Sequence, residues 1–170
     1  MKEHSVSNQD TGVIPTNYAA LLLQQAASIG IWEVVIGEPT IYWSDLTKQI
    51  HEVPQEFTPD LSQGLSFYKE GTHRDQIAHD FNSAVTYGKK YDGEYIIITA
   101  TGREKWVRSV GVPVFEHGKC VKVYGVFQDI DARKKIELRL RQNERRFRKI
   151  FEFAPTGMTL LDLDGCFLRL

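Results

Sequence analysis

The sequence predicts an α+β fold in which a five-stranded antiparallel sheet carries helices on one face. The first observation is the order of segments: two β-prone stretches come early, a helical region follows, and three β-prone stretches come late. The second is glycine, which separates the late stretches in the turn signals Thr101-Gly102 and His117-Gly118. The third is the lack of a strand–helix–strand alternation, which disfavours a parallel, doubly wound sheet.

Each expected strand is rich in β-branched and aromatic residues. Residues 31–36 and 41–43 are predicted to form a hairpin. Residues 94–100, 105–115 and 119–128 are predicted to form an antiparallel meander. The first strand is expected to lie beside the last.

The helices are predicted from apolar spacing and from their stop signals. Residues 16–28 are expected to form an N-terminal helix, with Thr16 as its N-cap. Prolines and glycines divide residues 44–72, which favours short helices and loops there. Residues 73–88 are predicted to form a helix that ends at Gly88. One face of this helix carries Ile77, Phe81, Ala84 and Val85.

The linker segment 132–153 holds neither glycine nor proline and is predicted to be a long helix. Its seam residues, spaced alternately by four and three, are Ile136, Leu140, Asn143, Phe147 and Ile150. A repeat of 3.5 residues with one polar position is typical of a two-stranded coiled coil. The sequence therefore predicts a homodimer that pairs through its flanking helices.

Charge is unevenly distributed, although the net charge is −1. Residues 131–150 hold nine basic and three acidic residues, whereas residues 1–130 are acidic overall. A basic helix can bind nucleic acid or an anionic membrane, but the regular apolar seam favours a solvated face of a coiled coil. We expect no nucleic-acid partner.

The two ends of the chain are interpreted separately. Residues 1–15 are polar and are expected to be a disordered tail. Residues 154–170 contain two short β-prone stretches around Asp164-Gly165, which predicts the truncated start of a second domain. No apolar run is long enough to span a bilayer, and no secretory signal is present. The two cysteines, Cys120 and Cys166, form no disulfide framework, which favours a reducing, intracellular compartment, and a cytoplasmic location is expected.

Motifs of catalysis and metal binding are missing from the sequence. It contains no phosphate-binding loop, no nucleophile elbow and no His-Glu-x-x-His, and its histidines and two cysteines lack ligand spacing. We expect no catalytic residues and no metal. His79 is a conceivable haem ligand, but helical geometry places it opposite Ile77 and Phe81, so solvation is the preferred interpretation. The tryptophans are assigned to packing rather than to base stacking.

Several motifs together resemble the PAS sensor domain with its PAC segment, of the kind called PAS fold 3. They are IGIWE (29–33), IYWSD (41–45), YDGEY (91–95), REKWVR (103–108) and DID (129–131). The resemblance covers residues 16–131. Residues 144–165 resemble the opening of a second PAS domain. The resemblance implies a bacterial multidomain signalling protein.

The resemblance also carries expectations for individual residues. In the family, an Asp-Ile-Thr signature ties the last strand to the exit helix, which implies a signal relay at Asp129, Ile130 and Asp131. Asp131 replaces the usual Thr and is expected to cap the exit helix. The flavin-binding branch has an Asn-Cys-Arg-Phe-Leu-Gln motif that is absent here, and Phe127 occupies the position of its flavin-contacting glutamine. Flavin is therefore disfavoured, as is haem.

The favoured function is a ligand-sensing and dimerising module that is not itself an enzyme. A small cavity bounded by Phe81, Val85 and Phe127 is expected to take an unidentified small molecule, whose binding shifts the relay and the linker helix. By resemblance, a histidine kinase or GGDEF diguanylate cyclase is expected as the output domain of the same polypeptide. The alternative is a structural dimerisation spacer without a ligand, and a third hypothesis is nucleic-acid binding through the basic helix.

Overall fold

A computed structural model describes residues 28–153 of the protein. The chain divides into two units, residues 1–129 and 130–170. Within residues 28–153, the first unit contains a sheet with three helices, and the second contains one long helix. The predicted tail, residues 16–27 of the predicted N-terminal helix 16–28, and the predicted start of a second domain at 154–170 lie outside the described residues.

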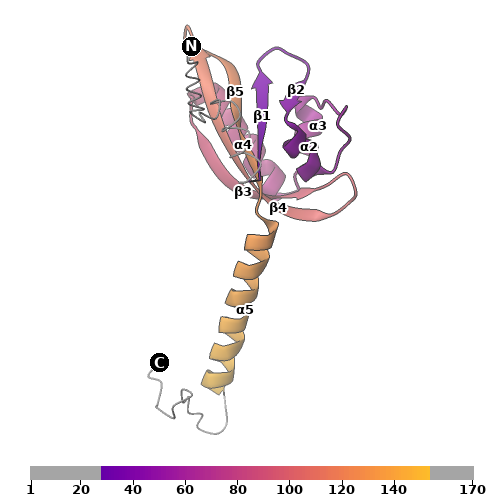
Figure 1. Ribbon diagram of the computed structural model, residues 1–170. Coiled ribbons are helices and arrows are strands. Elements are labelled where there is room, and N and C mark those ends of the chain that lie inside the picture. The colour runs from indigo at the N-terminus through magenta and orange to yellow at the C-terminus, as the bar shows by residue number, and fades with distance from the viewer. Residues whose placement is uncertain (1–27, 154–170) are drawn as a thin grey trace, which may run out of the picture. The chain divides into compact units, whose positions relative to one another are not determined.

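The sheet has five antiparallel strands in the order β2-β1-β5-β4-β3 (Figure 1). They are β1 (Ile29–Val35), β2 (Ile41–Trp43), β3 (Tyr91–Ile98), β4 (Glu104–Glu116) and β5 (Lys119–Asp129). The first strand pairs with the last, with Ile29 opposite Gln128. The predicted fold class and strand neighbours are confirmed.

Three helices of the first unit pack on the sheet, and local sequence explains their ends. They are α2 (Asp45–His51), α3 (Leu61–Ser66) and α4 (Thr72–Tyr87). Ser44 begins α2, since its hydroxyl accepts a hydrogen bond from the Thr47 amide. Asp60 and Gln63 form a capping box at α3. The predicted stop of α4 is confirmed, because Gly88 adopts a left-handed conformation there.

One hydrophobic core joins the inner face of the sheet to these helices. Tyr95, Ile97 and Val107 alternate with outward-facing residues on β3 and β4 and are almost completely buried. Ile77 and Ala84 supply the buried face of α4. Each large apolar side chain buried in this way contributes about 1.5–3 kcal/mol. The core therefore holds α4 firmly against the sheet.

Two glycines make room for tyrosine rings in this core. A Cβ added at Gly93 would overlap the Tyr95 ring, and one added at Gly111 would overlap the Tyr91 ring. Gly111 lies opposite Tyr91 in the β3–β4 ladder. Tyr91 therefore lies flat across β4, where its ring stacks at 6.3 Å from that of Trp32.

The second unit contains α5 (Asp131–Phe153), as the periodicity predicts. Its surface holds local ion pairs, including Asp131 with Lys135 at 2.7 Å and Glu137 with Arg141 at 2.8 Å. Asp131 does not occupy the cap position, which corrects our expectation. The Lys134 amide donates to the Ile130 carbonyl, so Ile130 is the cap and Asp131 lies in the first turn. An acidic residue there still suits the helix dipole.

Candidate functional site

A cavity of about 50 Å³ lies in the first unit, between the sheet and its helices. Its walls are Trp32, Val34, Ile41, Trp43, Thr47, His51, Leu61, Gly64, Leu65, Tyr68, Ile77, Phe81, Tyr91, Ser109 and Phe127. The walls contain no aspartate, glutamate, lysine or arginine among the described residues. Such a cavity suits an uncharged occupant, because a bare charge would be buried without a counter-charge.

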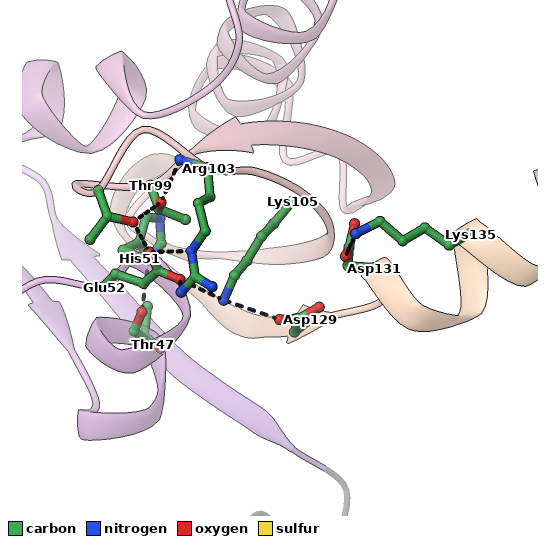
Figure 2. Close-up of polar contacts among 10 residues, drawn as sticks. Thr47, His51, Glu52, Thr99, Arg103, Lys105, Asp129, Asp131 and Lys135 are labelled. Carbon is green, nitrogen blue, oxygen red and sulfur yellow. Dashed lines mark hydrogen bonds and ion pairs between the residues drawn. The ribbon is translucent and has the colours of Figure 1, made fainter.

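His51 is the most unusual residue of the cavity wall, since it is only 1% exposed. It is the last residue of α2, and its Nδ1 lies 2.8 Å from the carbonyl oxygen of Thr47, one turn earlier (Figure 2). Its ring is stacked between two aromatic rings, with centroid distances of 4.0 Å to Trp43 and 4.7 Å to Phe127. The imidazole plane is therefore fixed by contacts on both faces.

Burial keeps the His51 imidazole neutral. Desolvation lowers the pKa of His51 to about 4, the hydrogen bond to Thr47 opposes this shift only in part, and the charge of Lys105 adds to it. A carbonyl oxygen can only accept a hydrogen bond, so Nδ1 carries the proton of the neutral ring. The other nitrogen, Nε2, is then an acceptor.

Hydroxyl groups form a second polar feature of the cavity wall. Burial raises the pKa of Tyr68 and of Tyr91, and hydrogen bonding to Ser109 opposes both shifts. These phenols therefore stay protonated and can donate. The Tyr95 ring packs edge-on against that of Tyr68, with the centroids 5.5 Å apart. Burial raises the pKa of Tyr95, and its hydroxyl donates a hydrogen bond of 2.7 Å to the Asp80 carboxylate.

Tyr91 also borders a second, more polar hollow of about 370 Å³. That hollow lies between α4 and the start of β3, and its wall includes Asp80, Lys89 and Lys90. The Tyr91 ring is thus a wall shared by the inner cavity and this outer hollow.

Glu52 follows His51 directly, but its side chain contacts Thr101 and Arg103 and does not line the cavity. It leaves α2 in a left-handed conformation, with φ 61°, which is rare for a residue with a side chain. Its carboxylate accepts hydrogen bonds from Thr101 and from the guanidinium of Arg103. These bonds lower the pKa of Glu52 to about 2.

Lys105 connects Glu52 to the end of the last strand (Figure 2). Its Nζ lies 3.2 Å from Oε1 of Glu52 and 3.4 Å from Oδ2 of Asp129. Asp129 is the last residue of β5, and α5 begins two residues later at Asp131. A chain of contacts thus runs from the cavity wall to the exit of the first unit.

The residues predicted for the site are placed as follows. Phe81 and Phe127 line the cavity, whereas Val85 packs against the core without lining it. His79 is exposed on α4. In α5, Asn143 is exposed, and Phe147 is 45% exposed.

Sequence reasoning missed His51 in the cavity wall and the neighbouring ion pair of Glu52 with Lys105. One signal was available for His51. In the short helix after Ser44, positions 47, 50 and 51 share a face, and the apolar Ile50 indicates that this face is buried. The partners of Glu52 are about fifty residues away in sequence, and no local pattern indicates them.

Comparison with known proteins identifies the family. A family profile described as PAS fold matches residues 40–127, about half of the chain. The chain belongs to the PAS fold family. This confirms the resemblance seen in the sequence motifs.

Two curated relatives are similar over part of their length. Sensor protein FixL of Bradyrhizobium diazoefficiens is 24% identical over 138 residues, which is 81% of this chain and 27% of FixL. An uncharacterized protein of Sinorhizobium fredii, y4lL, is 31% identical over 91 residues, which is 53% of this chain and 11% of that protein. The chain therefore corresponds to a small part of each relative.

Solved structures show the same fold. A sensory box histidine kinase/response regulator from Burkholderia thailandensis has a TM-score of 0.65 at 23% identity, covering 76% of this chain and 98% of that one. The N-terminal domain of a diguanylate cyclase with a PAS/PAC sensor, from Marinobacter aquaeolei, has a TM-score of 0.56 at 14% identity. It covers 62% of this chain and 98% of that one.

A Light-Oxygen-Voltage domain studied with a flavin analogue is also similar, with a TM-score of 0.53 at 14% identity over 75% of this chain and 97% of that one. The cavity of the present structure has a smaller volume than such a cofactor. An engineered cavity of roughly 150 Å³ binds benzene, whereas the volume here is about 50 Å³. Phe127 also offers no amide group to a flavin ring.

Two features are missing from the part of the chain that the structure describes. Among residues 28–153, no helix is long and apolar enough to cross a membrane. Within that same range, His, Cys, Asp and Glu side chains form no group of three or more that could hold a metal ion.

Proposed function

We propose that this chain is the sensory module of a multidomain signalling protein, in which occupancy of the cavity changes the conformation at the start of α5. The observation that carries the proposal is the line of contacts from His51 through Glu52 and Lys105 to Asp129. A molecule in the cavity lies against the His51 ring, and one peptide bond connects that residue to the ion-pair network. The occupant can therefore bias the position of Asp129.

A second contact acts on the same strand. The His51 ring stacks on Phe127, which lies two residues before Asp129 on β5. Movement of the imidazole therefore reaches the end of β5 through the strand as well as through the ion pairs. The relay assigned to Asp129, Ile130 and Asp131 is part of this proposal.

The proposal assigns pairing to α5. Ile136, Leu140 and Ile150 are 67%, 59% and 56% exposed, although each belongs to the apolar seam. Exposed apolar stripes on helices are commonly covered by a partner helix. A homodimer would bury these side chains and would turn a local shift into a change between two chains.

The output is proposed from the similar proteins. Two solved structures of this fold come from a histidine kinase/response regulator and from a diguanylate cyclase. We assign an output domain of one of these types to the complete polypeptide, after a second PAS domain that begins near residue 154, and we place its action in the cytoplasm.

The small size of the cavity favours a second candidate function. A structural dimerisation spacer needs no ligand, and its core is filled by its own aromatic side chains. A cavity of about 50 Å³ is close to that condition. The two functions differ in whether a change in the cavity alters α5.

The test fills the cavity with a larger side chain and measures whether the hydrogen–deuterium exchange of α5 changes. Ser109→Leu places an apolar side chain in the cavity, and hydrogen–deuterium exchange of residues 131–150 reports on the helix. If the chain is a sensor, Ser109→Leu should alter the hydrogen–deuterium exchange of α5. Adding Lys105→Met to Ser109→Leu should suppress this change, because it breaks the proposed relay. Arg108→Gln is the matched control, because it removes an ion pair with Asp92 away from the relay.

A folded Ser109→Leu protein with unchanged α5 exchange contradicts the sensing proposal and supports the spacer. Near-ultraviolet circular dichroism checks that the variant is folded. Suppression by Arg108→Gln as well as by Lys105→Met contradicts the assigned relay.

A further inference from the structure

We infer that the cavity recognises a small, uncharged ligand with an N–H or O–H group, and that His51 Nε2 accepts the hydrogen bond from this group. This inference rests on the proposed sensing function. It goes further by naming the class of ligand and the residue that selects it.

The hydrogen-bonding state of His51 supplies the first argument. Nδ1 donates to the Thr47 carbonyl, so Nε2 of the neutral ring is left as an acceptor. Within the described residues, Nε2 has no hydrogen-bond partner. Among those residues, every side-chain nitrogen or oxygen that is fully buried has a hydrogen-bond partner. Because Nε2 has no such partner, it is not fully buried and must border free space. The space that His51 borders is the cavity.

The ring stack supplies the second argument. Trp43 and Phe127 lie on the two faces of the imidazole, each within 20° of parallel. The lone pair of Nε2 lies in the ring plane, so its direction is fixed before any ligand arrives. A preorganised acceptor loses little entropy on binding and favours a donor placed in that plane.

Charge narrows the class of ligand. A carboxylate or phosphate has no cation to meet in the wall and would face the Nε2 lone pair. A cation has no carboxylate to meet there, and the positive charge of Lys105 acts on this same ring. An uncharged donor satisfies Nε2 without either penalty.

The size of the cavity and the other polar groups in its wall restrict the class of ligand further. A volume of about 50 Å³ admits a molecule of a few non-hydrogen atoms, with small adjustments of the wall for a five-membered ring. The Tyr68 and Ser109 hydroxyls offer a second polar contact in the same wall. The aromatic rings favour a planar ligand.

The experiment compares pyrrole with furan. These uncharged five-membered rings have nearly the same shape, but only pyrrole carries an N–H donor. Their affinities are measured on the 170-residue chain by NMR titration, with the ¹⁵N shift of His51 Nε2 followed in parallel. We expect pyrrole to bind roughly tenfold more tightly than furan, the ratio that one net hydrogen bond supplies. The Nε2 resonance should move with pyrrole and not with furan.

Variants locate the source of the preference. His51→Phe keeps an aromatic ring between Trp43 and Phe127 but removes the acceptor, so the tenfold ratio should fall to about one. His79→Phe, at an exposed histidine of α4, is the matched control and should retain the ratio. Should His51→Phe fail to fold, the affinity ratio and the Nε2 shift of the unaltered chain decide the question.

The possible results separate this inference from the proposed function. Equal affinities for the two probes, or a ratio that persists in His51→Phe, overturn the role of His51. Failure of both probes to bind overturns the assigned class of ligand. Neither result decides whether the cavity controls α5, because the Ser109→Leu test uses no ligand.

Discussion

Apolar side chains are buried in the core of the first unit but exposed on helix α5. Ile97 and Val107 are completely buried by other parts of the same unit. Ile136 and Leu140 are 67% and 59% exposed. The core is therefore stable through contacts within one chain, whereas the apolar residues of α5 gain burial only from another surface.

The ion pairs differ in the same manner. Glu52 and Arg103 are 51 residues apart in sequence and meet only because the sheet and α2 pack together. Three ion pairs within α5 join residues only three or four positions apart: Lys134 with Glu137, Asp131 with Lys135, and Glu137 with Arg141. The Glu52–Arg103 pair thus depends on tertiary structure, whereas these three pairs of α5 depend on helix formation.

The largest effect is expected from breaking the seam of α5. Replacing Leu140 and Ile150 with Asp should weaken dimerisation at least a thousandfold, since each buried seam residue contributes about 1.5–3 kcal/mol. Sedimentation equilibrium measures the change, and circular dichroism checks that the sheet is retained. A double variant that remains as dimeric as the parent shows that pairing occurs elsewhere, with residues 16–28 as the next segment to test.

A substitution in the core of the first unit tests whether its buried apolar residues stabilise the fold more than those of α5. Ile97→Ala should lower the free energy of unfolding by about 2–5 kcal/mol, because it leaves a void among fully buried groups. Ile136→Ala is the matched control and should change the stability of the isolated monomer by less than about 0.5 kcal/mol. Urea denaturation at low protein concentration measures both. Equal losses would contradict the assignment of Ile136 to an exposed face.

His51 should make the core, and not α5, sensitive to acid. Its pKa is lowered on folding, so the unfolded chain takes up a proton first, and stability falls as the pH drops from about 6.5 to about 4. A shift from 6.5 to about 4 corresponds to a loss of roughly 3 kcal/mol. Urea denaturation at several pH values measures this loss.

Two controls identify the titrating group. His51→Phe should remove most of the pH dependence in this window. His73 also has a lowered pKa through desolvation, so His73→Gln should remove only a small part. Glu52 contributes at lower pH, because its pKa falls from 4.5 to about 2 on folding. Persistence of the full dependence in His51→Phe would show that another group titrates.

The smallest effect is expected at an exposed ion pair of the sheet. Arg108 and Asp92 are 44% and 51% exposed, and Arg108→Gln should cost about 0.2–1 kcal/mol, decreasing further in high salt. Lys105→Met should cost more, because Lys105 is 19% exposed and contacts both Glu52 and Asp129. The order of the two losses in urea denaturation checks the comparison, and a reversed order would contradict it.

Local sequence predicted the elements of the fold but not the polar part of its site. Alternating apolar residues and glycine turns indicated β3, β4 and β5, because strand pattern and turn chemistry are short-range properties. The stop at Gly88 was readable for the same reason. Of the three residues expected to bound the cavity, Phe81 and Phe127 lie in its wall, whereas Val85 packs against the core.

The missed residues depend on contacts between distant segments. A histidine is polar by composition, and only the rings of Trp43 and Phe127, contributed by two strands, make His51 a buried neutral acceptor. The cap of α5 was placed one residue late, because Asp is a common capping residue and Ile130 is not. Helix boundaries of this kind are set by backbone geometry more than by composition.

The pairing of β1 with β5 has a consequence for how such a module is inherited. Ile29 lies opposite Gln128, so the chain enters and leaves the sheet on adjacent strands at the same end (Figure 1). A unit whose ends meet can be inserted between two other segments of a polypeptide without forcing them apart. Gene duplication or recombination can then add or remove the unit as a cassette while the flanking segments keep their spacing.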